Sequence, residues 1–551
     1  MKKIILLVLP FISIYSFAQK PINKTQQTPA KPKLVVGVVI DQMRWDYLYR
    51  FYDLYSGNGG FKRLMNNGFS CDNTFVPYLP TFTACGHTCV YTGSVPAIHG
   101  ITGNNWWDKN LNRVVYCSED KSVEGLGGKD SVAGKMSPKN MLVTSICDEL
   151  RLSTNFKSKA IGIALKDRGA ILPAGHSANA AYWYDSKNGN FITSTYYMNT
   201  LPNWVTAFNN RKLVDSLYKL NWNILLPKEN YTLYASDDIK EYESKPFGKN
   251  QKGFPYNFSE FIGKDYKKIL TTPQGNTLTT EMAKAVLVNE KLGKGIYTDF
   301  LTVSYSSTDY IGHAFGPNSW EMVDDYVRLD IELGHLLDAL DKQVGKGNYT
   351  IFLTADHAVA HVPEFLVENK IPGGRTPKDS VLIREINTAI KEEFGIDSVL
   401  IAALNYQLTF NKATFQENNP NRQKIINRII EITSNIEGVA NVFELKNAAN
   451  TTLNSTIKER AINGYFANRS GDIQIIPKPG YLEGYSKTGT THGSWNPYDS
   501  HIPLLWYGWG IKKGATHRET YMTDIAATVA ALLKIQMPNG CVGKVISEVL
   551  E

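Results

Sequence analysis

The chain is poor in cysteine, and its apolar segments are short. It has six cysteines among 551 residues, and their spacing does not match a zinc knuckle. We therefore expect them to pack in the core or to pair in disulfides, not to bind metal. They are Cys71, Cys85, Cys89, Cys117, Cys147 and Cys541. The apolar stretches at 4–17 and 525–535 are too short to cross a bilayer, so we expect no membrane partner.

A dense block of one charge is also missing. The net charge is +7, and no lysine- and arginine-rich run resembles a nucleic-acid footprint, so no nucleic-acid partner is expected. Hydrophobic residues make up 43% and charged residues 20% of the chain, which is ordinary for a globular protein. There is no internal repeat or low-complexity tract. We expect a monomer that acts on small molecules.

The N-terminal residues have the pattern of a secretory signal. Two lysines precede the apolar stretch at 4–17, and a small-x-small cleavage site ends at Ala18. This pattern predicts a signal peptide at 1–18 and a loose leader at 19–33. No cysteine lies near Ala18, which argues against lipoprotein processing. We expect a soluble protein that is periplasmic or secreted.

Four short apolar runs end where unusual polar residues begin. Such nearly continuous runs are typical of strands that are covered on both faces. In open parallel sheets, ligands bind beyond the carboxyl ends of the strands, so this pattern predicts a site there. The runs are 34–40, 160–165, 300–304 and 349–353, and they lead to Asp41, Lys166, Asp309 and Asp356.

Helical segments are expected between these strands. One candidate covers 137–154, and the clearest covers 318–344, where Asn318 and Glu321 form a plausible capping pair. The stretch at 525–535 is expected to be a packed helix. Alternation of strand and helix predicts an α/β fold, a three-layer sandwich with a mostly parallel central sheet.

The expected catalytic domain covers 34–551. Two stretches interrupt the strand and helix pattern, at about 190–275 and at about 365–470. We predict that both are insertions beside the core, and that the second forms a compact subdomain.

Asp and His residues near the strand ends supply the ligand types that hold zinc. Asp309 and His313 lie four residues apart, so one helical turn or a tight loop would bring both to one metal. Asp356 and His357 are adjacent, so joint ligation requires the chain to turn there. His492 follows two threonines in a loop-like segment and is free to complete a site.

Any one of these residues alone is better explained as a capping aspartate or a hydrogen-bonded histidine. Their joint placement at strand ends favours a metal site. We expect an ordinary structural role for the other histidines, which are His87, His99, His176, His335, His361, His501 and His517.

Thr83 is the candidate nucleophile, in a segment rich in threonine that also contains Thr81 and Gly86. A hydroxyl in such a turn is a poor nucleophile alone, but a bound metal can ionise it at neutral pH. This combination indicates hydrolysis of a charged ester. Thr81, two residues earlier, is a rival nucleophile.

The order of these motifs resembles the metal-site pattern of the alkaline phosphatase superfamily. More narrowly, it is similar to the branch that contains nucleotide pyrophosphatase/phosphodiesterases and the phosphate-irrepressible periplasmic alkaline phosphatases (PafA type). The resemblance extends from about residue 34 to the C-terminus. It is carried by Asp41, Pro80-x-x-Thr83, Asp309-x-x-x-His313, Asp356-His357 and His492.

The resemblance implies two Zn²⁺ ions. One would be held by Asp309, His313 and His492, and the other by Asp41, Asp356 and His357. It also places the nucleophile on Thr83, which would bind the second zinc as its alkoxide and attack phosphorus to form a phosphothreonine. The first zinc would stabilise the departing oxygen.

Three further residues favour monoesters as the substrate. Asn104 matches the family's donor to a phosphate oxygen, and Lys166-x-Arg168 follows a strand, so both cations can face the site. A monoester carries an additional negative oxygen, so it binds more favourably where two cations are present. The resemblance implies that this Lys-x-Arg marks the monoesterases. We therefore predict an alkaline phosphatase, with a phosphodiesterase or nucleotide pyrophosphatase as the alternative.

Sulfatases, phosphoglycerate mutases and binding proteins fit the sequence less well. Sulfatases share this fold, but no cysteine here begins their Cys/Ser-x-Pro-x-Arg motif. Cofactor-independent phosphoglycerate mutases use a serine nucleophile in the cytosol, which the predicted signal contradicts. A binding protein without turnover would lack a nucleophile, a ligand or a cation, and none of these is missing.

Overall fold

The computed structural model describes residues 31–128, 132–235, 237–484 and 486–551. The predicted signal peptide at 1–18, and all but the last residues of the predicted leader at 19–33, lie outside the described residues. Within the described part of the chain, no helix combines the length and the apolar character needed to cross a bilayer.

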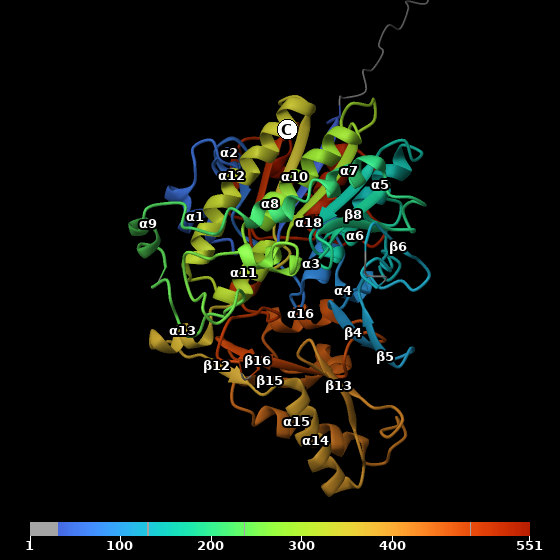
Figure 1. The fold of residues 1–551 in the computed structure, drawn as a ribbon. Coiled ribbons are helices and arrows are strands. Elements are labelled where there is room, and N and C mark those ends of the chain that lie inside the picture. The colour runs from blue at the N-terminus through green and yellow to red at the C-terminus, as the bar shows by residue number, and fades with distance from the viewer. Residues whose placement is uncertain (1–30, 129–131, 236, 485) are drawn as a thin grey trace, which may run out of the picture. The chain divides into compact units, whose positions relative to one another are not determined.

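A ten-stranded sheet forms the centre of the fold (Figure 1). Its middle strands run parallel, and every residue of β1, β7, β10 and β11 is buried. Burial on both faces explains why these strands are continuous apolar runs. The order is β20 (Gly514–Thr516), β2 (Phe69–Cys71), β19 (Leu504–Gly508), β11 (Tyr349–Thr354), β1 (Leu34–Ile40), β10 (Asp299–Tyr305), β7 (Ala160–Ala164), β8 (Ala180–Asp185), β9 (Asn190–Ser194) and β6 (Gly125–Leu126).

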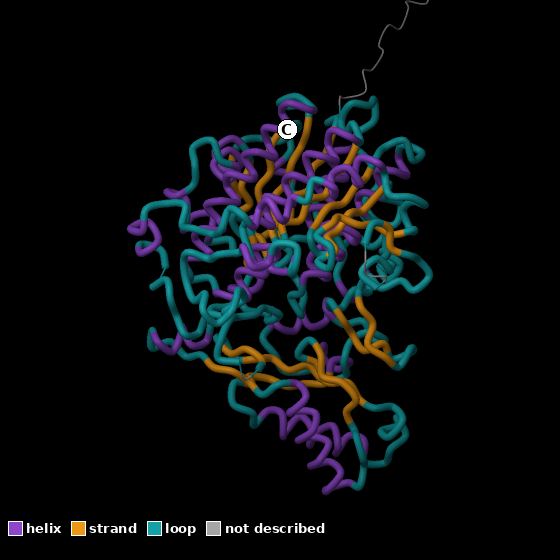
Figure 2. Tube along the Cα trace, viewed as in Figure 1, coloured by secondary structure: helices purple, strands orange, loops and turns teal. Residues whose placement is uncertain are grey.

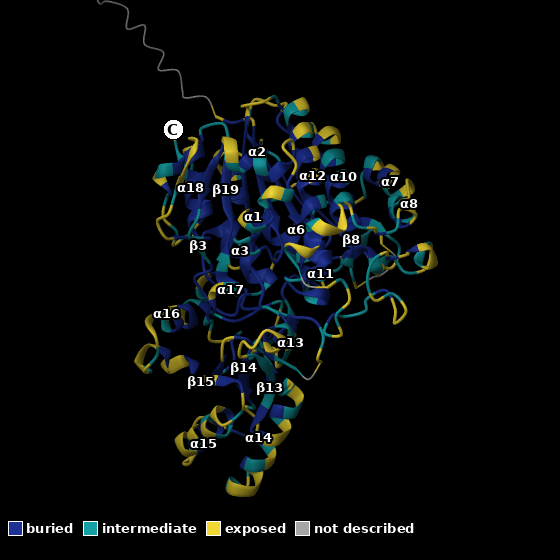
Figure 3. Ribbon diagram, turned by 90° about the vertical axis from the view of Figure 1, so that its left-hand side faces the viewer, coloured by how far each residue is buried: buried dark blue, intermediate teal, exposed yellow. Residues whose placement is uncertain are grey.

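Helices cover both faces of this sheet, and Figure 2 shows the strands enclosed between them. One layer contains α2 (Gly60–Asn67), α10 (Gln274–Asn289) and α12 (Trp320–Gln343). The other contains α3 (Thr83–Thr92), α5 (Ile146–Ser153), α6 (Asp167–Ala174) and α18 (Asp524–Leu533). Figure 3 shows α18 and α12 on opposite sides of β19. The predicted three-layer α/β fold with a mostly parallel sheet is therefore confirmed.

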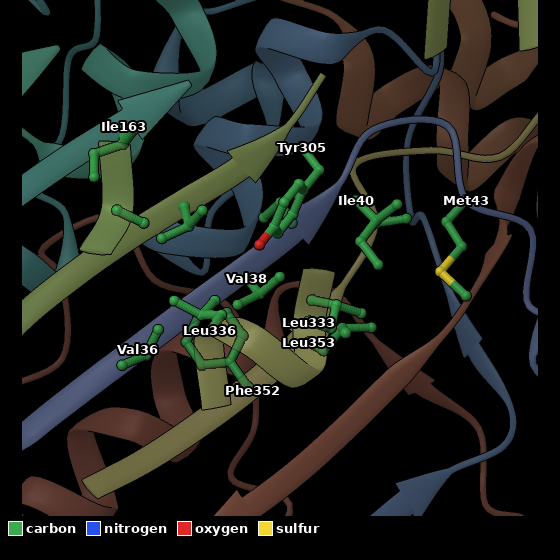
Figure 4. Packing of buried hydrophobic residues seen from close by; sticks show 14 of the residues in the cluster. Val36, Val38, Ile40, Met43, Ile163, Tyr305, Leu333, Leu336, Phe352 and Leu353 are labelled. Carbon is green, nitrogen blue, oxygen red and sulfur yellow. The ribbon is translucent and has the colours of Figure 1, made fainter. Parts of the chain in front are cut away.

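The core joins the central strands to these helices. Val36 and Val38 of β1 belong with Leu333 and Leu336 of α12 to one buried cluster (Figure 4). Transfer of such side chains from water stabilises the fold by about 1.5–3 kcal/mol each. All six cysteines are free thiols, and five of them are buried, so the structure supports packing rather than disulfides.

Two helix predictions need correction. The helix predicted at 318–344 begins at Trp320, because Ser319 is its N-cap and its hydroxyl accepts from Met322 N. The capping pair of Asn318 and Glu321 is therefore wrong by one position. The helix predicted at 137–154 shrinks to α5, because Ser145 and Asp148 form a capping box there. The packed helix predicted at 525–535 is present as α18.

Residues within the first predicted insertion form short helices, and aromatic side chains from this stretch join the main core. Phe208, Tyr218, Trp222 and Tyr256 are all buried in the main cluster. The helices are α7 (Asn203–Asn210), α8 (Leu213–Tyr218), α9 (Lys228–Thr232) and the 3-10 turns Ser259–Phe261 and Tyr266–Thr271.

Residues within and just beyond the second predicted insertion have a sheet and a core of their own. The antiparallel order is β13 (Leu400–Leu404), β14 (Gln407–Phe410), β16 (Ile473–Pro477) and β15 (Val439–Glu444). Helices α14 (Asp379–Phe394) and α15 (Arg422–Ser434) pack against it, and Ile386, Leu408 and Ile425 lie in a separate buried cluster. Treating the two stretches as insertions stays a prediction.

Short elements complete the described chain. The short strands are β12 (Gly374–Thr376) with β17 (Tyr481–Glu483), β18 (His501–Ile502) with β3 (Thr74–Phe75) and β21 (Thr520–Tyr521), and β4 (Asn105–Asp108) with β5 (Arg113–Tyr116). The remaining α-helices are α1 (Tyr47–Arg50), α4 (Pro96–His99), α11 (Ser307–Phe315), α13 (Pro363–Glu368), α16 (Ser455–Gly464) and α17 (Pro497–Ser500).

Candidate functional site

Four neighbouring strands place charged side chains at one edge of the central sheet. Asp41 follows β1, Lys166 caps α6 after β7, Asp309 lies in the first turn of α11 after β10, and Asp356 follows β11. Lys166 Nζ lies 2.7 Å from Asp41 Oδ2 and 2.6 Å from Asp309 Oδ2. The strand ends therefore converge as the apolar runs predicted.

Three histidines turn the same ring atom toward these carboxylates. Nδ1 of His313 lies 2.8 Å from Thr490 O, Nδ1 of His357 lies 3.0 Å from Ala358 O, and Nδ1 of His492 lies 2.6 Å from Thr81 O. A backbone carbonyl accepts a hydrogen bond from Nδ1–H, so Nε2 of each neutral ring keeps a lone pair. This outer hydrogen bond is the usual support of a metal-binding histidine.

The ligand atoms gather into two groups that could each hold a metal ion. One group is Asp41, Asp356 and His357, and the other is Asp309, His357 and His492. The second group contains His357 where the expected trio had His313, and His357 therefore lies within range of both groups. His313 nevertheless reaches the same carboxylate, with Nε2 3.2 Å from Asp309 Oδ1. The chain does turn after β11, as joint ligation by Asp356 and His357 requires.

The chemistry of the buried atoms fits a cation. Asp41 is fully buried, and its Oδ1 has no hydrogen-bond partner among the described residues. Burial and the neighbouring Asp356 raise the pKa of Asp41 well above its usual range. Burial alone would also raise the pKa of Asp309, but His313 and Lys166 outweigh it and hold that pKa well below its usual range. A buried carboxylate oxygen without a partner is costly unless a cation meets it.

Two of the histidines are suited to binding metal near neutral pH. Burial lowers the pKa of His357, and burial with the neighbouring His357 lowers the pKa of His492 well below its usual range. The two rings stack with centroids 3.5 Å apart. Neutral imidazole is the form that ligates a metal, so neither ring would need to lose a proton at neutral pH.

Thr83 lies at the start of a helix and against this cluster. It is the first residue of α3 and is 1% exposed, and its Oγ1 lies 3.4 Å from His357 Nε2. The rival Thr81 is occupied, because its hydroxyl donates to Ser494 O and accepts from Gly493 N. The unpaired N–H groups of a helix N-terminus favour an anion, so Thr83 is the better placed hydroxyl.

Asn104 lies beside the first turn of α3. Its Oδ1 accepts from Ala84 N at 3.0 Å. Because the carbonyl oxygen is used in this way, the amide nitrogen is the part of Asn104 that can donate to a ligand.

Lys166 and Arg168 reach the site by a different route from the one predicted. The chain turns into α6 at Asp167, so the two cations are not related by strand alternation. Arg168 Nη1 lies 3.2 Å from the Tyr116 hydroxyl, and Lys166 Nζ lies 5.1 Å from the centre of the Tyr310 ring. Neither tyrosine was predicted, because nothing in its local sequence marks it.

His87, for which the sequence indicated an ordinary structural role one turn beyond Thr83, lies beside the site. The residue is fully buried, with Nδ1 2.9 Å from Thr83 O and 3.3 Å from Asp356 Oδ2. Its Nε2 lies 2.8 Å from Ser304 Oγ on β10. Its spacing of four from Thr83 was the available signal, and its contacts are those of a residue that supports others.

Known proteins match this chain in sequence and in structure over nearly its whole length. The model of the family described as "Type I phosphodiesterase / nucleotide pyrophosphatase" matches residues 35–499. Alkaline phosphatase PhoV of Synechococcus elongatus is 51% identical over 545 residues, covering 97% of this chain and 96% of the relative. Alkaline phosphatase PafA of Elizabethkingia meningoseptica is 48% identical over 532 residues, covering 96% of each. The crystal structure of wild-type alkaline phosphatase PafA matches with a TM-score of 0.92 and 47% identity, covering 95% of this chain and 100% of that one.

Proposed function

The chain belongs to the type I phosphodiesterase/nucleotide pyrophosphatase family, and on that basis we propose that it is an alkaline phosphatase that hydrolyses phosphate monoesters. Two relatives with about half of their residues identical over nearly their full length are named alkaline phosphatases. The observation that favours monoesters is the presence of two cations, Lys166 and Arg168, at the start of the helix beside the carboxylate and histidine cluster.

The donor set suits zinc. Asp309, His313 and His492 would hold one ion, and Asp41, Asp356 and His357 the other. Nitrogen and carboxylate ligands at this ratio are typical of catalytic zinc. When bound, a zinc pair supplies Lewis acidity that promotes ionisation of a hydroxyl and stabilises a departing oxygen.

Thr83 is the proposed nucleophile. After loss of its proton, the Thr83 oxygen would form a bond to phosphorus while the bond from phosphorus to the leaving oxygen breaks, which releases the alcohol part of the ester. Water would then cleave the phosphothreonine to give inorganic phosphate and the free hydroxyl. The Ala84 N–H already donates to Asn104 Oδ1, so the Thr83 N–H at the start of α3 and the Asn104 amide nitrogen would be the donors to phosphate oxygens. Burial of Thr83 keeps bulk water away from the attacking oxygen.

Lys166 supplies a charge that persists in alkaline solution. Burial alone would lower its pKa, but the carboxylates of Asp309 and Asp41 outweigh burial and raise the pKa above the ordinary value. The ammonium therefore stays positive under conditions in which a phosphate monoester is a dianion. Arg168 adds a second positive charge that can meet the extra oxygen of that dianion.

Export is part of the proposal. The N-terminal pattern of charged, apolar and small residues favours a signal peptide at 1–18. It would deliver the mature protein to the periplasm or the medium.

The second candidate is hydrolysis of phosphodiesters, because the family description names that activity. A comparison of p-nitrophenyl phosphate with bis(p-nitrophenyl) phosphate on the purified protein separates the two. We expect a kcat/KM for the monoester at least about a hundredfold higher, since two cations meet its second negative charge. A higher kcat/KM for the diester would refute the monoesterase.

A further inference from the structure

Gln42 directly follows Asp41 and has an unusual backbone conformation. Its φ is 69°, in the left-handed region that residues with a side chain rarely adopt. It is 2% exposed. Glutamine has no special preference for this region, so the surrounding contacts must hold it there.

Those contacts join the two ligand groups. The backbone N–H of Gln42 donates to Asp356 Oδ1 at 3.1 Å, and its side-chain amide Nε2 donates to Asp309 Oδ1 at 2.7 Å. Asp356 belongs to one group and Asp309 to the other. One residue therefore hydrogen-bonds a carboxylate from each.

The amide of Gln42 is also confined sterically by α11. A Cβ at Gly312 would lie 1.9 Å from Gln42 Oε1, so only glycine at that position leaves room for the amide. Gly312 lies on the same helix as Asp309 and His313. The close approach of this helix thus leaves space for the amide beside the carboxylate to which it donates.

Gln42 Nε2 donates to Asp309 Oδ1, which is the oxygen of that carboxylate that faces the histidines. His313 Nε2 and His492 Nε2 lie 3.2 and 3.7 Å from Asp309 Oδ1, whereas Lys166 Nζ takes Oδ2. A carboxylate oxygen has two lone pairs, so a donor on one leaves the other for a metal. The Gln42 amide sets the rotation of the Asp309 carboxylate at that oxygen.

We propose that Gln42 is a positioning residue that couples the two metal sites, an inference that rests on the proposed zinc pair. Its left-handed backbone orients Asp356 through the main chain, and its amide orients Asp309 through the side chain. Loss of the amide leaves the main-chain hydrogen bond in place. The Asp309 site should therefore weaken more than the Asp356 site, by roughly 10–100-fold in zinc affinity, as for other supporting partners of metal ligands.

The test compares Gln42→Gly and Gln42→Glu with the wild-type full chain. Gln42→Gly removes the amide and adopts the left-handed backbone without strain. Gln42→Glu keeps the length of the side chain, but an ionised carboxylate cannot donate a hydrogen bond to Asp309. Zinc affinity can therefore still be measured on this variant if Gln42→Gly folds poorly. Asn112→Gly is the matched control, because Asn112 is exposed and also has a positive φ of 50°.

Zinc affinity is measured by competition with a chromophoric chelator, and kcat and KM are measured on p-nitrophenyl phosphate. We expect each Gln42 variant to lose one of its two zinc ions at chelator concentrations that leave both ions on the wild type and on Asn112→Gly. We also expect kcat to fall more than KM rises.

The inference about Gln42 would be overturned, and the zinc pair retained, if the wild type binds two zinc ions and the variants release them only at the chelator concentrations that strip the wild type. Wild-type protein that binds no zinc would overturn the proposed metal pair and this inference with it.

Discussion

The hydroxyl oxygen of Thr83 lies 3.4 Å from Nε2 of His357. Because Nδ1 of His357 is directed to a backbone carbonyl, the free lone pair of its ring and the hydroxyl face the same buried space. Burial lowers the pKa of His357, so the ring is neutral and can bind a cation. The geometry therefore favours a threonine that is activated by a metal shared with this histidine.

Replacement of Thr83 tests the nucleophile. Thr83→Ala should lower kcat for a phosphate monoester by roughly a thousandfold or more, because it removes the hydroxyl that lies against His357. Thr83→Ser should retain much of the activity. Thr81→Ala is the matched control and should cost far less, since the Thr81 hydroxyl is engaged with the backbone around Ser494. Equal losses at Thr81 and Thr83 would contradict the assignment.

Replacement of the two cations tests the substrate class. Lys166→Ala or Arg168→Ala should reduce kcat/KM for p-nitrophenyl phosphate roughly tenfold or more beyond the loss for bis(p-nitrophenyl) phosphate, because only the monoester carries the second charge. Arg428→Ala removes a surface arginine that pairs with Glu393 and serves as the control. Parallel losses for both substrates would refute the role of the cations.

Metal removal tests the donor set. Incubation with EDTA should abolish activity, and zinc should restore it better than magnesium or calcium, because imidazole nitrogen suits zinc while calcium prefers oxygen alone. The measurement is activity after dialysis and addition of each ion at equal concentration. Full restoration by calcium alone would count against a site built on His313, His357 and His492.

A buried glutamate should make the fold less stable in alkali. Burial raises the pKa of Glu321 to about 8, and its Oε2 has no hydrogen-bond partner among the described residues. The folded state thus binds a proton that the unfolded state has released, so stability falls as pH rises from about 4.5 to about 8. Glu321→Gln removes this penalty and can still accept from the Tyr256 hydroxyl.

Thermal unfolding at pH 5 and pH 9 measures the effect. We expect Glu321→Gln to gain roughly 1–4 kcal/mol over the wild type at pH 9 relative to its difference at pH 5. Glu392→Gln, on an exposed face of α14, should show no such gain. A Glu321→Gln variant with the same difference from the wild type at both pH values would contradict the assignment.

Much of the site could be predicted because its residues follow strands whose apolar sequences are easy to recognise. Asp41, Asp309 and Asp356 are of this kind, and the parallel sheet brings their strand ends together whatever the loops do. The four-residue spacing of Asp309 and His313 was likewise enough, since α11 carries both.

Other features depend on tertiary contacts that have no local signature. Gln42 has a left-handed backbone conformation, and the sequence around a glutamine does not indicate that conformation. Tyr116 meets Arg168 from a strand about fifty residues away. The cap at Ser319 rather than Asn318 was decided by which side chain accepts from Met322 N, a choice between neighbours that sequence rules do not resolve.

Elemental analysis of active protein, joined to anomalous diffraction at the zinc edge, tests the two-zinc site most directly. We predict two zinc ions per chain, about 3.5–4 Å apart, among Asp41, Asp309, Asp356 and the three histidines beside Thr83. Active protein that contains no zinc, or zinc bound away from Thr83, would contradict the account.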